Sequence, residues 1–186
     1  YGLGGSETSA ATDPAILDVS RVVNLDGTLE NNFSFTRQGQ LDYLLASGKL
    51  AIDLGSSYLF MDVAASNLIN SSFDSETLSA FNTYLGDTYT SAELSNFGIS
   101  ELTSFNYGQY LRDAGYTDSD SIYNSPPNDD LSKAWLKHMR KVERTFFTQW
   151  TNQLRDYGSD NYNRAIYFGA NRSTGSRQWA NIDFFD

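Results

Sequence analysis

Three polar side chains recur at helical spacing in the segment LDGTLENNFSFTR, residues 25–37. Glu30, Ser34 and Arg37 stand four and three residues apart, which places them on one face if the segment is a helix. A carboxylate and a hydroxyl one turn apart, with a backbone carbonyl between them, are ligands of the kind that a hard cation such as Mg²⁺ takes. The alternative is an exposed helical face on which Glu30 is simply solvated.

Glu143 is the second residue whose position suggests chemistry. It follows Met139 by four residues and precedes Trp150 by seven, so it shares their apolar helix face. Desolvation by aromatic neighbours raises the pKa of a carboxyl group, which can then act as a general acid or base near neutral pH. The simpler interpretation is an ion pair with Arg140 at the surface of the same helix.

The only histidine of the chain, His138, lies about 140° around that helix from Glu143, given 3.6 residues per turn. A Ser-His-Asp triad would have to use His138, and the sequence has no nucleophile-elbow motif. A structural role is the alternative. The chain has no cysteine, which excludes internal disulfides, cysteine-ligated zinc and a thiol nucleophile.

A long helix must carry Glu143 and His138. Asp129 and Asp130 are typical capping residues, and Gly158 is a typical stop, so the sequence predicts a helix that runs to Tyr157. Apolar residues recur between them at spacings of three and four, which indicates one core-facing stripe. The stripe consists of Leu131, Trp135, Met139, Val142, Phe146, Trp150 and Leu154.

The rest of the chain also favours helices. Cap and stop residues predict helices over residues 13–24 and 28–46, the second closed by Gly48. Shorter helices are expected before Gly86, after Thr90, which begins a capping box, and before Gly115. The segment 116–130 contains two prolines and is predicted to be a loop, and the last 26 residues a short strand with loops.

The fold class predicted from these elements is all-α. A flexible arm, residues 1–12, precedes a single, mostly helical domain, residues 13–186, whose C-terminal segment is rich in loops. The 186 residues are 40% apolar and 15% aromatic, enough for a real core. No apolar run approaches the roughly 20 residues of a membrane span.

Charge and composition narrow the expected partners. The formal net charge of −10 disfavours nucleic acid and anionic membrane surfaces, because both carry negative charge. Three N-x-Ser/Thr triplets begin at Asn32, Asn70 and Asn171, and they become glycan sites only in a secretory pathway. The chain begins at Tyr1, without an initiator methionine or a signal peptide, so we expect a processed product, and a composition rich in Asp, Ser, Asn, Gly and Tyr favours a secreted protein.

The segment GTLENNFSFTR resembles a motif of a known family. The fungal secreted heme-thiolate peroxidases (chloroperoxidases and unspecific peroxygenases) carry a segment of the type G-x-[IV]-E-[HG]-D-x-S-x-[ST]-R. The matching places are taken here by Gly27, Glu30, Ser34, Thr36 and Arg37. The motif is moderately specific.

Two later segments are similar to further parts of that family and follow in the same order. DLSKAWLKHMRKVERTFF resembles the helix that carries the distal acid, and NRAIYFGANRSTGSRQW resembles the C-terminal region through Phe168, Arg172 and Trp179. The resemblance covers residues 15–45 and 130–180.

The resemblance implies a cofactor, a metal and an activity. Glu30, the backbone carbonyl of Asn31 and Ser34 would bind Mg²⁺ near a heme propionate. Glu143 would be the distal acid, with Arg140 as its partner. The implied activity is peroxide-driven oxygenation or halogenation of small organic substrates, in which the heme supplies the redox chemistry.

The sequence departs from the family pattern at defined positions. The proximal thiolate has no counterpart, since the chain lacks cysteine, and Asp26, Asn32 and Leu136 stand where the family has His, a carboxylate and Arg. Two interpretations follow. The chain is the larger C-terminal part of a peroxygenase-like protein whose cysteine lies on a companion N-terminal chain. Alternatively, it is a non-enzymatic secreted α-helical binding or structural subunit without heme.

Overall fold

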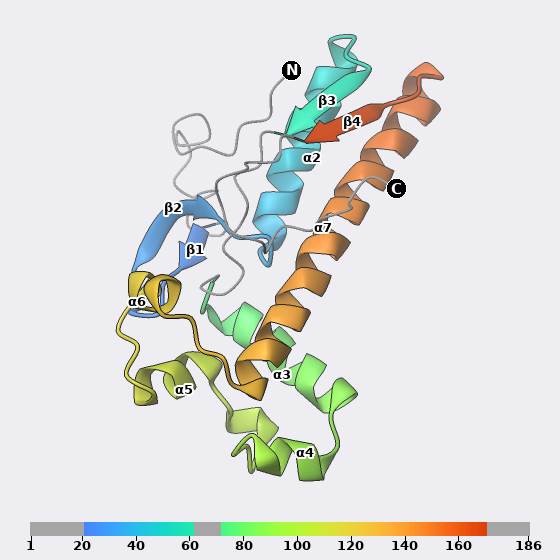
Figure 1. Ribbon diagram of the computed structural model, residues 1–186. Helices are drawn as coiled ribbons and strands as arrows, with labels where there is room; N and C mark the ends of the chain where they lie inside the picture. The colour runs from blue at the N-terminus through green and yellow to red at the C-terminus, as the bar shows by residue number, and fades with distance from the viewer. Residues whose placement is uncertain (1–20, 62–71, 171–186) are drawn as a thin grey trace. The chain divides into compact units, whose positions relative to one another are not determined.

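The computed structural model describes residues 21–61 and 72–170, and these residues are mostly helical (Figure 1), which confirms the predicted all-α class. The predicted arm, residues 1–12, lies outside the described residues. The helices are α2 (Gln38–Asp53), α3 (Ser75–Thr88), α4 (Ser91–Asn96), the 3₁₀ turn η1 (Leu102–Ser104), α5 (Tyr107–Asp113), α6 (Ser119–Asn124) and α7 (Asp130–Tyr162). The strands are β1 (Arg21–Val23), which pairs with β2 (Leu29–Phe33), and β3 (Tyr58–Met61), which pairs in parallel with β4 (Tyr167–Ala170).

The chain divides into two compact units. The α2 unit contains the described residues of 31–67 and 142–186 together with Arg21, and the α3 unit contains those of 22–30 and 68–141. Helix α7 supplies residues to both units, with the division after Lys141. The prediction of a single domain over residues 13–186 stays a prediction.

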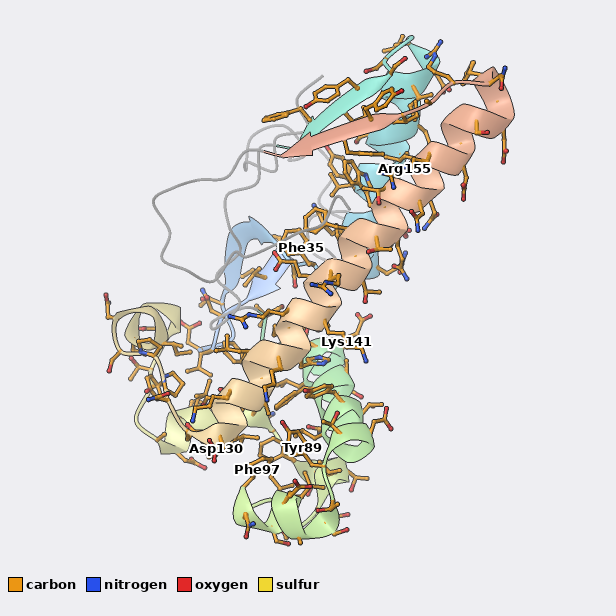
Figure 2. The ribbon with its side chains drawn as sticks, turned by 45° about the vertical axis from the view of Figure 1, so that its right-hand side comes forward. Phe35, Tyr89, Phe97, Asp130, Lys141 and Arg155 are labelled. Atoms are coloured by element: carbon orange, nitrogen blue, oxygen red, sulfur yellow. The ribbon has the colours of Figure 1, made fainter. Side chains whose placement is uncertain are left out.

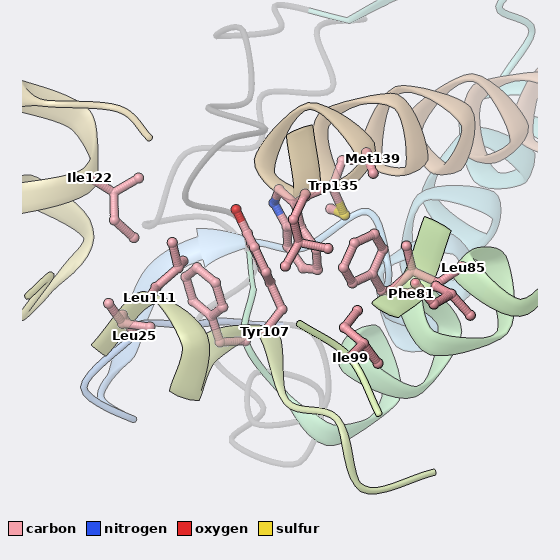
Figure 3. Packing of buried hydrophobic residues seen from close by; sticks show 13 residues of the cluster. Leu25, Phe81, Leu85, Ile99, Tyr107, Leu111, Ile122, Trp135 and Met139 are labelled. Carbon is pink, nitrogen blue, oxygen red and sulfur yellow. The ribbon is translucent and has the colours of Figure 1, made fainter. Parts of the chain in front are cut away.

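Aromatic side chains build the core of the α3 unit (Figure 3). The Trp135 ring is fully buried. It stacks on Tyr107 at a centroid distance of 4.7 Å and meets Phe81 edge-on at 5.0 Å. Leu85 and Leu111 are also fully buried beside these rings. Such ring pairs stabilise the fold beyond the free energy gained when each side chain removes its large apolar area from water.

Side-chain caps fix the helix ends in the α3 unit. The Asp74 carboxylate accepts hydrogen bonds from two backbone N–H groups in the first turn of α3, both at 3.0 Å. Thr90 and Glu93 form the predicted capping box at the start of α4. Asp129 accepts from the backbone N–H of Ser132 at 2.8 Å and from its hydroxyl at 2.7 Å, which confirms the predicted start of α7.

The α2 unit has a core of its own, formed by α2, the C-terminal part of α7 and the inner face of β3 and β4. The Trp150 ring is fully buried and its indole N–H donates to the backbone carbonyl of Leu44 at 3.3 Å. Leu59 on β3 and Leu154 on α7 are also fully buried. The predicted stripe on α7 is therefore real, but its first half packs in one core and its second half in the other.

The helix predicted over residues 28–46 is wrong in its first half. Residues 29–33 form strand β2 after a tight turn in which Gly27 has a φ of 87° and Asp26 accepts from the Thr28 backbone N–H at 2.9 Å. Helix α2 begins only at Gln38. The two asparagines of ENN are poor helix formers, and the Asp-Gly turn directs the chain back along β1. Residues 29–33 therefore pair with β1 instead of forming a helix.

Three glycines that were predicted to end helices lie inside them: Gly48 in α2, Gly86 in α3 and Gly158 in α7. A Cβ built on Gly48 would stand 2.5 Å from a methyl group of Leu154, and one built on Gly158 would overlap the side chain of Ile166. Gly48 and Gly158 are both buried. They allow close packing rather than helix termination, so α7 continues to Tyr162.

Other boundaries also differ from the prediction. The predicted loop 116–130 contains the short helix α6, which Asp118 caps, and the predicted helix before Gly115 is shortened to α5. Val22 lies in strand β1 rather than in a helix. None of the helices among the described residues is both long and apolar enough to cross a lipid bilayer.

Candidate functional site

Glu143 is buried in the α2 unit. Its exposed fraction is 1%, and the rings of Phe146 and Phe147 follow it on α7. Both rings contact Phe35 at centroid distances of 5.1 Å. The predicted burial of Glu143 is therefore present. Arg140, the proposed partner, is exposed and belongs to the part of α7 that is counted with the α3 unit.

The predicted Mg²⁺ site rested on a helix that is not formed. Glu30 and Asn31 lie in strand β2, and Ser34 follows the end of that strand. The Ser34 hydroxyl is buried and shares a hydrogen bond of 2.6 Å with the Thr36 hydroxyl. The helical spacing of Glu30, Ser34 and Arg37 therefore does not apply, and Arg37 is the residue that precedes α2. Among the residues whose placement is described, no three acidic or histidine side chains form a metal-binding group.

The chain's residues do not fit a heme as its sole ligands. These 186 residues include no cysteine, so they supply no thiolate ligand. The lone imidazole, of His138, is only 6% exposed and packs among the aromatic rings of the α3 unit, whereas Glu143 belongs to the α2 unit. The residues that the heme resemblance matched at Arg172 and Trp179 lie outside the described residues.

The outer face of the β3–β4 pair is an aromatic surface that was not predicted from the sequence. Side chains alternate along a strand, and Leu59 and Phe168 point into the core, where Phe168 meets Trp150 at 5.0 Å. The other face therefore holds the remaining positions of the two strands. These positions are Tyr58 and Phe60 on β3 and Tyr167 and Gly169 on β4.

Two tyrosines of this face lie side by side and reach solvent. Tyr58 and Tyr167 are register partners, with exposed fractions of 51% and 63%. A Cβ built on Gly169 would overlap the Tyr58 hydroxyl and would stand 2.9 Å from its ring carbon Cζ. The Tyr58 ring therefore leans across β4 over Gly169 and lies against the sheet. We call the face formed by Tyr58, Phe60, Tyr167 and Gly169 the aromatic face.

A network of two tyrosines and one carboxylate links the end of α2 to the C-terminal part of α7. The Asp53 carboxylate, at the end of α2, accepts hydrogen bonds from Tyr157 at 2.8 Å and Tyr162 at 2.6 Å, both on α7. These bonds lower the pKa of Asp53, and the bond to Asp53 raises the pKa of Tyr162 to about 12. Arg164 lies over the Tyr162 ring and donates to the backbone carbonyl of Ile52 at 3.0 Å.

Two cationic side chains of the α2 unit lie over aromatic rings that do not belong to the aromatic face. Arg155, which Figure 2 labels on α7, lies over the Phe168 ring at 5.2 Å, and Lys49 lies over the Tyr157 ring at 5.3 Å. The aromatic face itself contains no charged residue. The arrangement offers flat, uncharged aromatic surface with phenolic hydroxyls at its edge.

Comparisons with protein-family models, with curated proteins and with solved structures find no match for this chain. A function must therefore be argued from the geometry of its own residues.

Proposed function

We propose that this chain is a non-enzymatic, secreted α-helical binding module whose recognition surface is the aromatic face. The observation that carries the proposal is the pair of adjacent, more than half-exposed tyrosines at Tyr58 and Tyr167. Parallel strands are usually covered on both faces, so an exposed aromatic face on a parallel pair is unusual and indicates a ligand.

The shape and charge of the aromatic face favour a neutral carbohydrate as the ligand. The Tyr58 ring lies over Gly169, which presents a ring face to the outside. Pyranose rings have an apolar C–H face that stacks on aromatic rings and hydroxyls that bond to phenols. An anionic ligand would find no cation on this face, and the formal net charge of −10 would repel it.

The test is calorimetric titration of the protein with a panel of neutral oligosaccharides, beside an acidic polysaccharide. We expect Tyr58→Ala and Tyr167→Ala each to weaken binding about fivefold, equivalent to roughly 1 kcal/mol for one aromatic contact. Gly169→Ala should also weaken binding, because the added methyl group displaces the Tyr58 ring. Leu50→Ala is the matched control, since Leu50 is 59% exposed and lies on α2.

Two outcomes would overturn the proposal. One is the absence of binding to every neutral oligosaccharide in the panel. The other is binding that all three variants of the aromatic face leave unchanged, with folding of each variant verified by circular dichroism.

The second candidate function is a heme-thiolate peroxygenase-like activity, and the burial of Glu143 favours it. A carboxyl group that is 1% exposed beside aromatic residues is what the resemblance requires of a distal acid. This candidate includes a companion chain with the cysteine. Its Mg²⁺ would have to be held by Glu30 and Asn31 of strand β2 and by Ser34 after it, without the helical spacing from which the site was predicted. A small organic substrate and a peroxide would be its reactants.

A visible spectrum of native material that contains every associated chain tests this candidate. A Soret band is expected, and its absence would end the heme interpretation. If the band is present, Glu143→Gln should remove most peroxide-driven turnover and leave the spectrum largely intact. Arg144→Gln is the control, because Arg144 is the exposed neighbour on the same helix. Undiminished turnover in Glu143→Gln would show that Glu143 is not the acid.

A further inference from the structure

His138 is buried in the α3 unit without a hydrogen bond to its Nε2 atom. Its exposed fraction is 6%, and Nε2 finds no partner within the part of the chain that the structure describes. Aromatic rings surround it, with centroid distances of 5.1 Å to Tyr84, 5.6 Å to Phe81 and 6.4 Å to Trp135. Phe81 and Tyr84 belong to α3, whereas His138 and Trp135 belong to α7.

The groups around His138 give a protonated imidazole little compensation. Lys141, on the same helix, is the charged group that acts on it, and its charge repels an imidazolium. The titratable group that α3 presents is the Tyr84 phenol, and Tyr89, after α3, contacts the Tyr84 ring. No carboxylate among the described residues acts on His138. Burial, and next the charge of Lys141, lower the pKa of His138 from 6.5 to about 4.

We propose that His138 is an acid-sensitive latch, meaning a contact that holds α3 against the N-terminal part of α7 only while the imidazole is neutral. Protonation places a charge among aromatic rings beside a second cation, and that charge is solvated only if α3 moves away. This property is separate from carbohydrate binding, because His138 and the aromatic face belong to different units.

The direction of the pH effect follows from the two pKa values. A pKa near 4 in the closed form and near 6.5 in the open form means that the open form binds more protons between these values. The latch is therefore fully stabilising above about pH 6.5 and loses its effect as the pH falls toward 4. Between pH 7 and pH 4 the equilibrium constant for opening should rise roughly 100-fold.

Hydrogen exchange followed by mass spectrometry, from pH 7 to pH 4, tests the latch. After correction for the intrinsic pH dependence of exchange, peptides of α3 should lose protection roughly 100-fold, measured against peptides of α2 in the same sample. His138→Phe should abolish the extra loss in α3, since the sequence has no other histidine. Lys141→Gln should make the loss smaller, because it removes the repelling charge and raises the pKa of the closed form.

Two results would overturn the latch. One is an α3 that keeps its protection relative to α2 down to pH 4. The other is an identical pH dependence in the wild-type protein and His138→Phe. If His138→Phe does not fold, the Lys141→Gln comparison decides, and an acid effect unchanged by that variant contradicts the proposal.

Discussion

The two units differ in where their large aromatic side chains lie. In the α3 unit, the rings of Trp135, Tyr107 and Phe81 are packed inside, together with the lone histidine. In the α2 unit, a buried core that includes Trp150 is combined with Tyr58 and Tyr167 on the surface. The surface that we propose for binding therefore belongs to the α2 unit, whereas the rings of the α3 unit are used in packing.

The two units also differ in the hydrogen bonding of their buried ionisable groups. His138 in the α3 unit has an Nε2 atom without a hydrogen bond in the described structure, whereas Glu143 in the α2 unit has interaction partners. A buried polar atom without a partner weakens a fold, and its cost depends on protonation. The α3 unit should therefore respond to acid more strongly than the α2 unit.

The largest predicted effect is a loss of stability that is confined to one of the two cores. Trp135→Ala should destabilise the α3 unit, and Trp150→Ala the α2 unit, each by about 3–5 kcal/mol, because each removes a fully buried indole. Native-state hydrogen exchange should show the loss of protection mainly in the unit that carries the substitution. An equal loss in both units from either variant would contradict the comparison.

The next effect tests the glycines inside the helices of the α2 unit. Gly48→Ala and Gly158→Ala should each destabilise the protein by about 1–3 kcal/mol, because the added methyl group meets Leu154 or Ile166. Gly86→Ala in α3 is the comparison, since Gly86 is exposed and its added Cβ would stand 3.3 Å from a methyl group of Leu102, a looser contact than the other two glycines would make. Urea unfolding measures all three, and stabilisation by Gly48→Ala or Gly158→Ala would refute the close packing.

The smallest predicted effect concerns the network at the end of α2. Asp53→Asn should lower the pKa of Tyr162 from about 12 toward 10, because the carboxylate holds the phenol in its protonated form. Since this pKa is raised in the folded protein, the stabilisation is present below about pH 10 and is lost as the pH rises through about 12. NMR titration of the labelled tyrosine ring carbons measures the shift, with Asp156→Asn as the control, and an unchanged Tyr162 would show that Asp53 is not its partner.

Local signals in the sequence predicted much of the helical structure. The apolar stripe of α7, the caps at Asp129 and Thr90, and the strand near Tyr167 depend on neighbours in sequence, and all are present. Gly48 and Gly158 were predicted as stops because a glycine after a periodic segment usually ends a helix. Their actual role depends on Leu154 and Ile166, which are distant in the chain and invisible to a local pattern.

The candidate sites also depended on contacts that local sequence patterns do not show. The burial of Glu143 was predicted, because it follows from helix periodicity. The helical face predicted for Glu30 and Ser34 is wrong, because β2 pairs with β1 and this segment is not a helix. The aromatic face was missed because Tyr58 and Tyr167 are 109 positions apart and meet only through the register of β3 and β4. The segments YLFM and YFGA are short apolar and aromatic runs, which favour strands but do not show which residues share the outer face.

The most direct test of the central claim is an NMR titration of the protein, with its aromatic side chains isotope-labelled, by a neutral oligosaccharide. The account predicts saturable shifts in the ring signals of Tyr58, Phe60 and Tyr167, while Trp135 in the α3 core stays unchanged. Saturable binding with shifts confined to residues away from β3 and β4 would contradict the assignment of the aromatic face, and the absence of any shift would contradict carbohydrate binding itself.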